Sequence, residues 1–194
     1  IRKVIPTIHP AAAIRGMYIY RHMIAADLKK AKLESTTREL KRPERQLVFN
    51  FTTCTEVLEW LKYYEEASIV AFDIEVLNYE ISCISFSSDP SITISIPLAD
   101  KWTEEDEVLI YRGIQRVLGN PHSIKVAQNA IFDVHFLLTR CGIEVRGPIQ
   151  DTMIAHSIMY AELPKSLAFL VSVYGGSTAY YKDMVKFSNI KEES

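Results

Sequence analysis

The sequence predicts an α/β fold in which a mixed sheet is flanked by helices, with an N-terminal strand-helix appendage. Three β-rich runs at 68–76, 81–86 and 92–96 are separated only by short polar turns, as in an antiparallel meander. After them, helical periodicity alternates with one more strand candidate at 123–128. Strands that alternate with helices in this way favour a mixed sheet covered by helices.

The first segment, residues 1–33, has a strand candidate at 4–8, a His9-Pro10 turn and one helical run. A strand and helix of this length cannot bury a core alone, so we expect the segment to dock on other residues. Residues 34–46 hold seven charged residues and Pro43, and they predict a solvated linker. The remainder, 47–194, forms the main domain.

The main domain opens with a strand candidate at 47–51 and a helix that ends at Tyr64, started by a capping box at Thr53 and Glu56. After the meander, a helix from Thr103, capped by Asp106, ends near Gly119. A helix over 130–138 follows the strand at 123–128 and stops at Gly142. Helices at 151–160 and 166–174 complete an order that fits a ribonuclease-H-like fold. The side chains expected to face inward are Ile110, Ile114 and Val117 on one helix and Ile131, Val134 and Leu138 on another.

Composition excludes several classes of protein. The chain is 48% hydrophobic and 24% charged, as in ordinary globular proteins, and 22 Lys and Arg against 24 Asp and Glu give a formal charge of −2. No global basic field attracts nucleic acid, so polyanion binding requires a local site or metal ions. Cys54, Cys83 and Cys141 are far apart and indicate reduced thiols, hence an intracellular protein. No apolar run is long enough for a membrane span.

The most informative residues are Asp73 and Glu75, which follow the apolar residues Ile69, Val70 and Phe72. Residues two apart on a strand face the same side, so both carboxylates project together. Two carboxylates at the end of a deeply buried strand repel each other unless a cation lies between them, and oxygen ligands favour Mg²⁺ or Mn²⁺. A solvent-facing acidic pair is the alternative.

A third carboxylate, Asp133, lies in the first turn of the helix that follows the strand at 123–128. There the helix dipole and the N–H groups favour an anion or a phosphate. An ordinary first-turn charge is the alternative. Together with the Asp73-x-Glu75 strand, Asp133 becomes a candidate third metal ligand.

These motifs resemble a known family. Asp73-x-Glu75 resembles the first motif of DEDD 3′-5′ exonucleases, and Asn129-x-x-Phe132-Asp133 is similar to the second motif in proofreading domains of family A DNA polymerases, especially phage-type ones. The resemblance covers about residues 46–194. It implies release of nucleoside 5′-monophosphates from single-stranded DNA 3′ ends, two divalent cations held by the three carboxylates, and a polymerase domain in the same polypeptide as partner. It also implies residues that hold the terminal nucleotides: Asn129, Val76, Leu77, Asn78 and Tyr79.

The family's third motif, Tyr-x-x-x-Asp or His-x-x-x-x-Asp, has no acceptable match. The preferred explanation is that the chain stops before this motif. Asp183 and Asp151 are weaker candidates for the fourth carboxylate, and a helix cap is the favoured role for Asp151. Weaker candidates for nucleic-acid contact are Lys165, Tyr180, Tyr181 and Lys182.

Residues 4–12 resemble the last strand, histidine loop and helix of uracil-DNA glycosylases, which precede the exonuclease in some phage polymerases. Residues 1–33 are therefore interpreted as a remnant of such a domain, without glycosylase activity. Two alternatives stay open for the whole chain. One is an RNA-trimming exonuclease of the same fold, and the other is a catalytically incomplete module that binds nucleic acid or acts as a scaffold.

Overall fold

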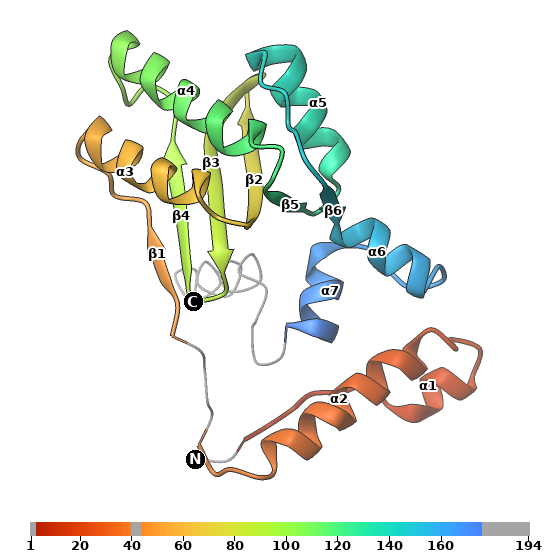
Figure 1. Cartoon of the computed structure of the whole chain (residues 1–194). Helices are drawn as coiled ribbons and strands as arrows, with labels where there is room; N and C mark the ends of the chain where they lie inside the picture. Colours follow the sequence, from red (N-terminus) through yellow and green to blue (C-terminus); the bar gives the residue numbers. More distant parts are fainter. Residues whose placement is uncertain (1–2, 40–43, 176–194) are drawn as a thin grey trace. The chain divides into compact units, whose positions relative to one another are not determined.

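The computed structural model describes residues 3–39 and 44–175 (Figure 1). The chain divides into two compact units, Glu44–Ala155 and a second one that combines Ile1–Pro43 with His156–Ser194. We call the first the sheet unit and the described part of the second the helical unit. The boundary at residues 43 and 44 falls inside the segment predicted as a linker.

The sheet unit is built on six strands in the order β1-β4-β3-β2-β5-β6. β2, β3 and β4 form the predicted antiparallel meander, while β1 pairs with β4, β2 with β5 and β5 with β6 in parallel. The mixed sheet of the predicted fold class is therefore confirmed. The strands are β1 (Gln46–Val48), β2 (Ile69–Leu77), β3 (Glu80–Asp89), β4 (Ile92–Pro97), β5 (Ile124–Ala127) and β6 (Ile149–Asp151).

Helices connect the parallel strands. α3 (Cys54–Glu65) leads from β1 to β2, α4 (Glu104–Gly119) from β4 to β5, and α5 (Ala130–Cys141) from β5 to β6. α3 and α4 lie side by side in front of the sheet (Figure 1). Parallel strands joined through a helix cross over with right-handed geometry. All three connections run in the same direction across the sheet, which places their helices on one face.

The core lies between this face and the helices. Val70, Phe72 and Ile74 of β2 belong to the same buried cluster as the predicted inward residues Ile110 and Ile114 of α4. The sequence predicts that β2 is deeply buried, but β2 is buried on one face only. Ile69, one of the residues on which that prediction rests, is 41% exposed. The alternation of β2 therefore directs its even-numbered side chains into the core and its odd-numbered ones to the other face.

Two of the three helix-capping predictions are confirmed. The Thr53 side chain accepts a hydrogen bond from the Glu56 backbone N–H, and α5 ends at Gly142 with φ of 68°. The reciprocal bond of the capping box is displaced by one residue, because the Glu56 carboxylate accepts from Thr52. At α4 the prediction was wrong, since Thr103 is the cap and Asp106 supplies only its backbone N–H.

The helical unit contains α1 (Pro10–Ile14), α2 (Tyr20–Glu34), the second half of α6 (Thr152–Met159) and α7 (Leu167–Tyr174). The strand predicted at 4–8 is absent from the structure, because this stretch pairs with no other strand. The single predicted helical run is interrupted near Gly16, whose φ of +105° is incompatible with a continuous helix.

The N-terminal segment does dock on other residues, as expected. Leu163, Phe169 and Leu170 form a small buried cluster, and Ile19 and Met23 pack against it. No helix in the part of the chain that the structure describes is both long and apolar enough to cross a membrane.

Lys125 lies in the middle of β5 and is fully buried. Its ammonium group donates hydrogen bonds to the backbone carbonyl oxygens of Asn120, Ser123 and Arg146 at 2.5, 3.0 and 3.0 Å. Burial lowers the pKa of this ammonium. These three bonds connect the loop before β5 and the loop before β6 to β5, the strand that leads into α5.

We predict that Lys125→Met destabilises the protein by about 2–4 kcal/mol, because three carbonyl groups lose their charged donor. Urea unfolding followed by circular dichroism measures this change. Lys62→Met, at an exposed position on α3, is the matched control and should stay within about 0.5 kcal/mol of the wild type. An equally small effect at position 125 would contradict the structural role assigned to Lys125.

Candidate active site

Asp73 and Glu75 lie on β2 and point away from the core. Their neighbours Phe72 and Ile74 are buried, whereas both acidic residues are exposed. The pleat of the strand therefore places the two carboxylates on one face, as the spacing predicts. Both side chains make further interactions within the protein.

A β-bulge lies directly beside Glu75. Glu75 pairs with Cys83 and Val76 pairs with Ile81, so Ser82 is an extra residue on β3, and its hydroxyl donates to the Glu75 carbonyl at 3.0 Å. The bulge makes Ile84, and not Cys83, the next buried residue after Ile81. A bulge bends the strand that carries the extra residue and increases the local twist, and this one lies on β3 directly opposite Glu75 of β2.

Asp133 is buried on α5, with 4% of its surface exposed. It shares the inner side of the helix with Ala130 and Leu137. The predicted inner residues were wrong in two of three cases, since Ile131 is 76% and Leu138 51% exposed. Hydrophobic periodicity therefore predicts an inner side of α5 that is shifted by one residue. The shift arises because the Asp133 carboxylate occupies an inner position at which the pattern expects an apolar residue.

The structure brings Asp133 and Asp73 together. β5 pairs with β2 only over Ile69–Ala71, so β2 continues past the end of β5 to the place where α5 begins. The pKa of Asp133 is raised to about 6, mainly because burial disfavours its charge and secondly because Asp73 repels it. The backbone N–H of Ile74 partly offsets this rise. The carboxylates of two distant segments therefore meet in one place.

The Asp151 carboxylate caps the N-terminal ends of α5 and α6. At the end of β6, this carboxylate accepts hydrogen bonds from the N–H groups of Asn129 and Ala130 at 3.1 and 2.8 Å, and from Met153 and Ile154 at 2.8 and 3.3 Å. The favoured helix-capping role is confirmed at α6. The N–H groups at the start of α5 do bind an anion, as expected, but for Asn129 and Ala130 this anion is the Asp151 carboxylate.

The residues predicted to hold nucleotides lie at two positions. Val76 and Leu77 end β2, and Asn78 and Tyr79 form the β2–β3 turn with φ of 51° and 65°. Leu77 and Tyr79 are 64% and 79% exposed, so an apolar and an aromatic side chain project into solvent beside the acidic strand. Asn129 precedes α5 with φ of 60°, and its side chain makes no capping bond.

The remaining candidates lie elsewhere. Lys165 belongs to the helical unit, just before α7. Tyr180, Tyr181, Lys182 and Asp183 fall outside the described residues. Within 3–39 and 44–175, no group of three or more His, Cys, Asp or Glu is arranged to hold a metal ion. The donor chemistry nevertheless fits a divalent cation, since a buried carboxylate is repelled by a second one and both offer oxygen ligands.

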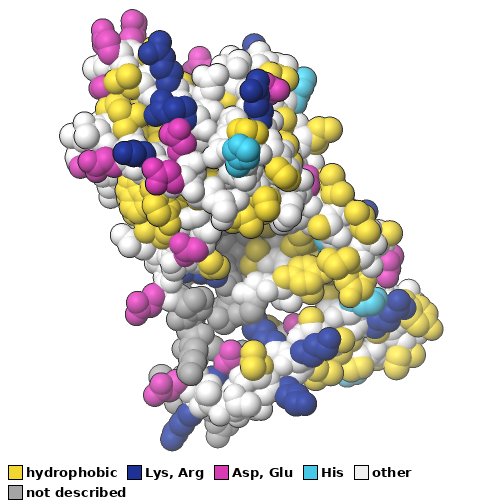
Figure 2. All heavy atoms as spheres, viewed as in Figure 1, with side chains coloured by type: hydrophobic (Ala, Val, Ile, Leu, Met, Phe, Trp, Pro, Cys, Tyr) yellow, Lys and Arg dark blue, Asp and Glu magenta, His cyan; other side chains and the backbone are white. Residues whose placement is uncertain are grey.

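The face of the sheet unit that α3 and α4 cover carries no one-sided charge. Acidic and basic groups are mixed over α3 and α4 on the visible face of the sheet unit (Figure 2). This mixture agrees with the formal charge of −2. Attraction of a polyanion to the sheet unit therefore depends on the local site.

The fold is shared with solved exonuclease structures. These include the catalytic core of RRP6 from Trypanosoma brucei, with a TM-score of 0.58, 19% identity and coverage of 77% of this chain and 42% of that one. Escherichia coli RNase D gives a TM-score of 0.54 at 18% identity and covers 73% and 36% of the two chains. Both likenesses support the ribonuclease-H-like fold predicted from the sequence.

The chain belongs to the 3′-5′ exonuclease family associated with family A DNA polymerases, whose model matches residues 48–189. DNA polymerase I of Pseudomonas aeruginosa is 28% identical over 139 residues, which are 64% of this chain and 15% of that protein. DNA polymerase I of Synechocystis sp. is 29% identical over 156 residues, or 74% and 16%. The chain thus matches about one sixth of the length of these relatives.

We predict that the pH dependence of stability reports the burial of Asp133. Its pKa in the folded protein, about 6, exceeds the ordinary value of 3.8, so ionisation destabilises the metal-free fold as pH rises from about 4 to 6. With chelator present, Asp133→Asn should therefore gain about 1–3 kcal/mol over the wild type at pH 7. Below pH 4 this gain should disappear.

Urea unfolding at the two pH values measures the difference. Glu59→Gln, which changes an exposed acid on α3, is the control and should show no such dependence on pH. A gain from Asp133→Asn that is the same at both pH values would mean that the carboxylate is not destabilised by its surroundings.

Proposed function

We propose that this protein removes nucleotides from the 3′ end of single-stranded DNA by hydrolysis and releases nucleoside 5′-monophosphates. The observation that carries the proposal is the meeting of Asp133, buried on α5, with Asp73 on β2. Two carboxylates that are brought together, one of them buried, repel each other, and this repulsion is costly for a structural role alone. The cost is understandable when they bind cations that act on a phosphodiester.

Asp73, Glu75 and Asp133 are the residues that would hold divalent cations, Mg²⁺ or Mn²⁺, and two ions are expected from the resemblance. Bound cations would neutralise the scissile phosphate and make an attacking water more acidic. The fold of the protein positions these carboxylates. The pleat of β2 aims two carboxylates at one place, and the bulge at Ser82 bends the strand beside Glu75.

The terminal nucleotides are proposed to lie against the β2–β3 turn. Tyr79 offers an exposed aromatic face, on which any base can stack without being read by sequence. Leu77 adds apolar surface beside it. The Asn129 side chain, which makes no capping bond, is available near the start of α5 for a polar contact with the substrate.

DNA is proposed as the substrate because the curated relatives are DNA polymerases. We infer that the protein proofreads for a polymerase domain of the same polypeptide, of the phage type, inside a cell. A glycosylase-like origin of residues 1–33 and a third motif beyond Ser194 belong to the same proposal. A single-stranded oligoribonucleotide of the same length tests the RNA alternative directly.

We predict that the full chain, supplied with Mg²⁺ or Mn²⁺, shortens a 5′-fluorescent oligodeoxynucleotide one residue at a time. Asp73→Asn and Asp133→Asn should each reduce the rate by several orders of magnitude, because each removes a cation ligand. Denaturing gels measure the products, and Glu59→Gln should behave as the wild type. A reduction of only a few-fold would contradict the roles assigned to both acids.

If the chain binds DNA tightly but never hydrolyses it, while a longer polypeptide with the third motif does, the fragment lacks a catalytic part. If neither hydrolyses DNA or RNA, the proposed activity is wrong and the binding-module alternative holds. Removing the cations with EDTA should stop hydrolysis, and adding Mg²⁺ back should restore it.

We further predict that Tyr79→Asn raises KM about tenfold with little change in kcat, because stacking is lost while the left-handed turn is kept. Asn adopts positive φ readily, so the hairpin should fold as before. Steady-state kinetics on a short oligonucleotide measures the effect. Tyr79→Phe keeps the ring and should restore the wild-type KM, so equal values for both variants would exclude stacking.

A further inference from the structure

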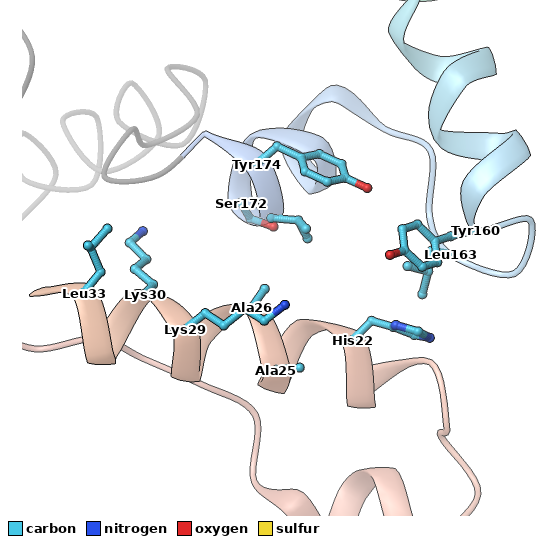
Figure 3. A pocket seen from close by; sticks show the side chains of 11 residues that line it. His22, Ala25, Ala26, Lys29, Lys30, Leu33, Tyr160, Leu163, Ser172 and Tyr174 are labelled. Atoms are coloured by element: carbon cyan, nitrogen blue, oxygen red, sulfur yellow. The ribbon is translucent and has the colours of Figure 1, made fainter.

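The helical unit contains a cavity of about 410 Å³ between α2 and α7 (Figure 3). We call it the α2–α7 groove, and its volume lies within the usual range of ligand pockets. Ala25 and Ala26 contribute small side chains on the α2 side, which leaves space between the two helices. The polar and aromatic side chains that matter for the argument are His22, Lys29, Lys30, Tyr160, Ser172 and Tyr174.

The groove is positively charged. Lys29 and Lys30 contribute two ammonium groups, and no carboxylate is among the lining residues. Neither lysine forms an ion pair with any described residue. Glu162 lies 3.6 Å from the His22 ring and offsets charge only at that end. The cationic end of the groove is therefore the one formed by the two lysines.

The groove also carries aromatic faces that are held in place. The Tyr174 hydroxyl is 2.9 Å from Nδ1 of His156, a residue that is 1% exposed and packed against the rings of Phe169 and Tyr160. The His22 and Tyr160 rings lie 5.1 Å apart. Figure 3 shows the Tyr160 and Tyr174 rings across the groove from α2. Rings fixed in advance lose little entropy when a ligand stacks on them.

We propose that the α2–α7 groove binds a segment of single-stranded nucleic acid, with phosphates at Lys29 and Lys30 and a base against Tyr160 or Tyr174. Adjacent cations and aromatic rings are what sequence-independent binding of single strands requires. An apolar partner helix would instead bury two ammonium groups without a counter-charge. The choice of nucleic acid as ligand rests on the function proposed above, while the groove itself is separate from the acidic site.

The test uses the full chain carrying Asp73→Asn, so that the probe is not degraded, and a 5′-fluorescein-labelled dT₁₂. Fluorescence anisotropy at several KCl concentrations gives the affinity and its salt dependence. The double variant Lys29→Ala/Lys30→Ala should bind about tenfold more weakly. Its slope of log affinity against log salt should be shallower by about 1.4, since each phosphate contact on a single strand contributes about 0.7.

Lys32→Ala is the matched control, because Lys32 lies on the same helix but does not line the groove. It should bind within about twofold of the parent protein. Tyr160→Leu should weaken binding about tenfold at every salt concentration, whereas Tyr160→Phe should not, because stacking needs only the ring. A parallel series with rU₁₂ shows whether the groove distinguishes the two sugars.

If Lys29→Ala/Lys30→Ala binds as tightly as Lys32→Ala, with the same slope, the proposal is overturned even when the wild type hydrolyses DNA. If the groove variants lose affinity although the wild-type chain hydrolyses neither DNA nor RNA, the groove stands and the exonuclease proposal fails. The lysine variants alter only partly or fully exposed positions. They keep the test valid even if Tyr160→Leu does not fold.

Discussion

The organisation of the sheet unit depends on one unfavourable contact, the approach of the buried Asp133 carboxylate to Asp73. Burial and repulsion both raise the pKa of Asp133, and hydrogen bonds from the backbone N–H groups of Ile74 and of Asp133 itself partly oppose this rise. An apolar residue at this inner position of α5 would stabilise the fold more. A cation bound as proposed would offset this repulsion.

Several features of the fold position the residues of this contact. β5 is short and stops before the acidic end of β2, which gives α5 room to begin there. The bulge at Ser82 bends β3 beside Glu75. Asp151 binds the first N–H groups of α5 and of α6 at once, so a single carboxylate fixes where both helices start. The acidic site is thereby positioned by backbone contacts from three strands.

The near-neutral charge of the chain is consistent with two local solutions to polyanion binding. In the proposed function the acidic strand would bind cations before it approaches a phosphate, whereas the α2–α7 groove carries its own ammonium groups. These two kinds of contact differ in their response to salt and chelators. Chemistry and strand binding can therefore be separated experimentally within one chain.

Sequence alone determined the features that depend on neighbours within a few residues. The spacing of Asp73 and Glu75 fixed their common face, Thr53 and Gly142 fixed two helix ends, and short polar turns fixed the meander. Such features depend on backbone geometry and local hydrogen bonds, which a short stretch of sequence encodes.

Only the tertiary structure decided the rest. Residues 4–8 have the composition of a strand but find no partner, and β6 forms because β5 offers one. The buried side of α5 could not be read from hydrophobic periodicity, because Asp133 lies on it and Ile131 does not. Lys125 is buried because three carbonyl groups converge on it. Partners far apart in the chain decide these outcomes, and no local pattern contains them.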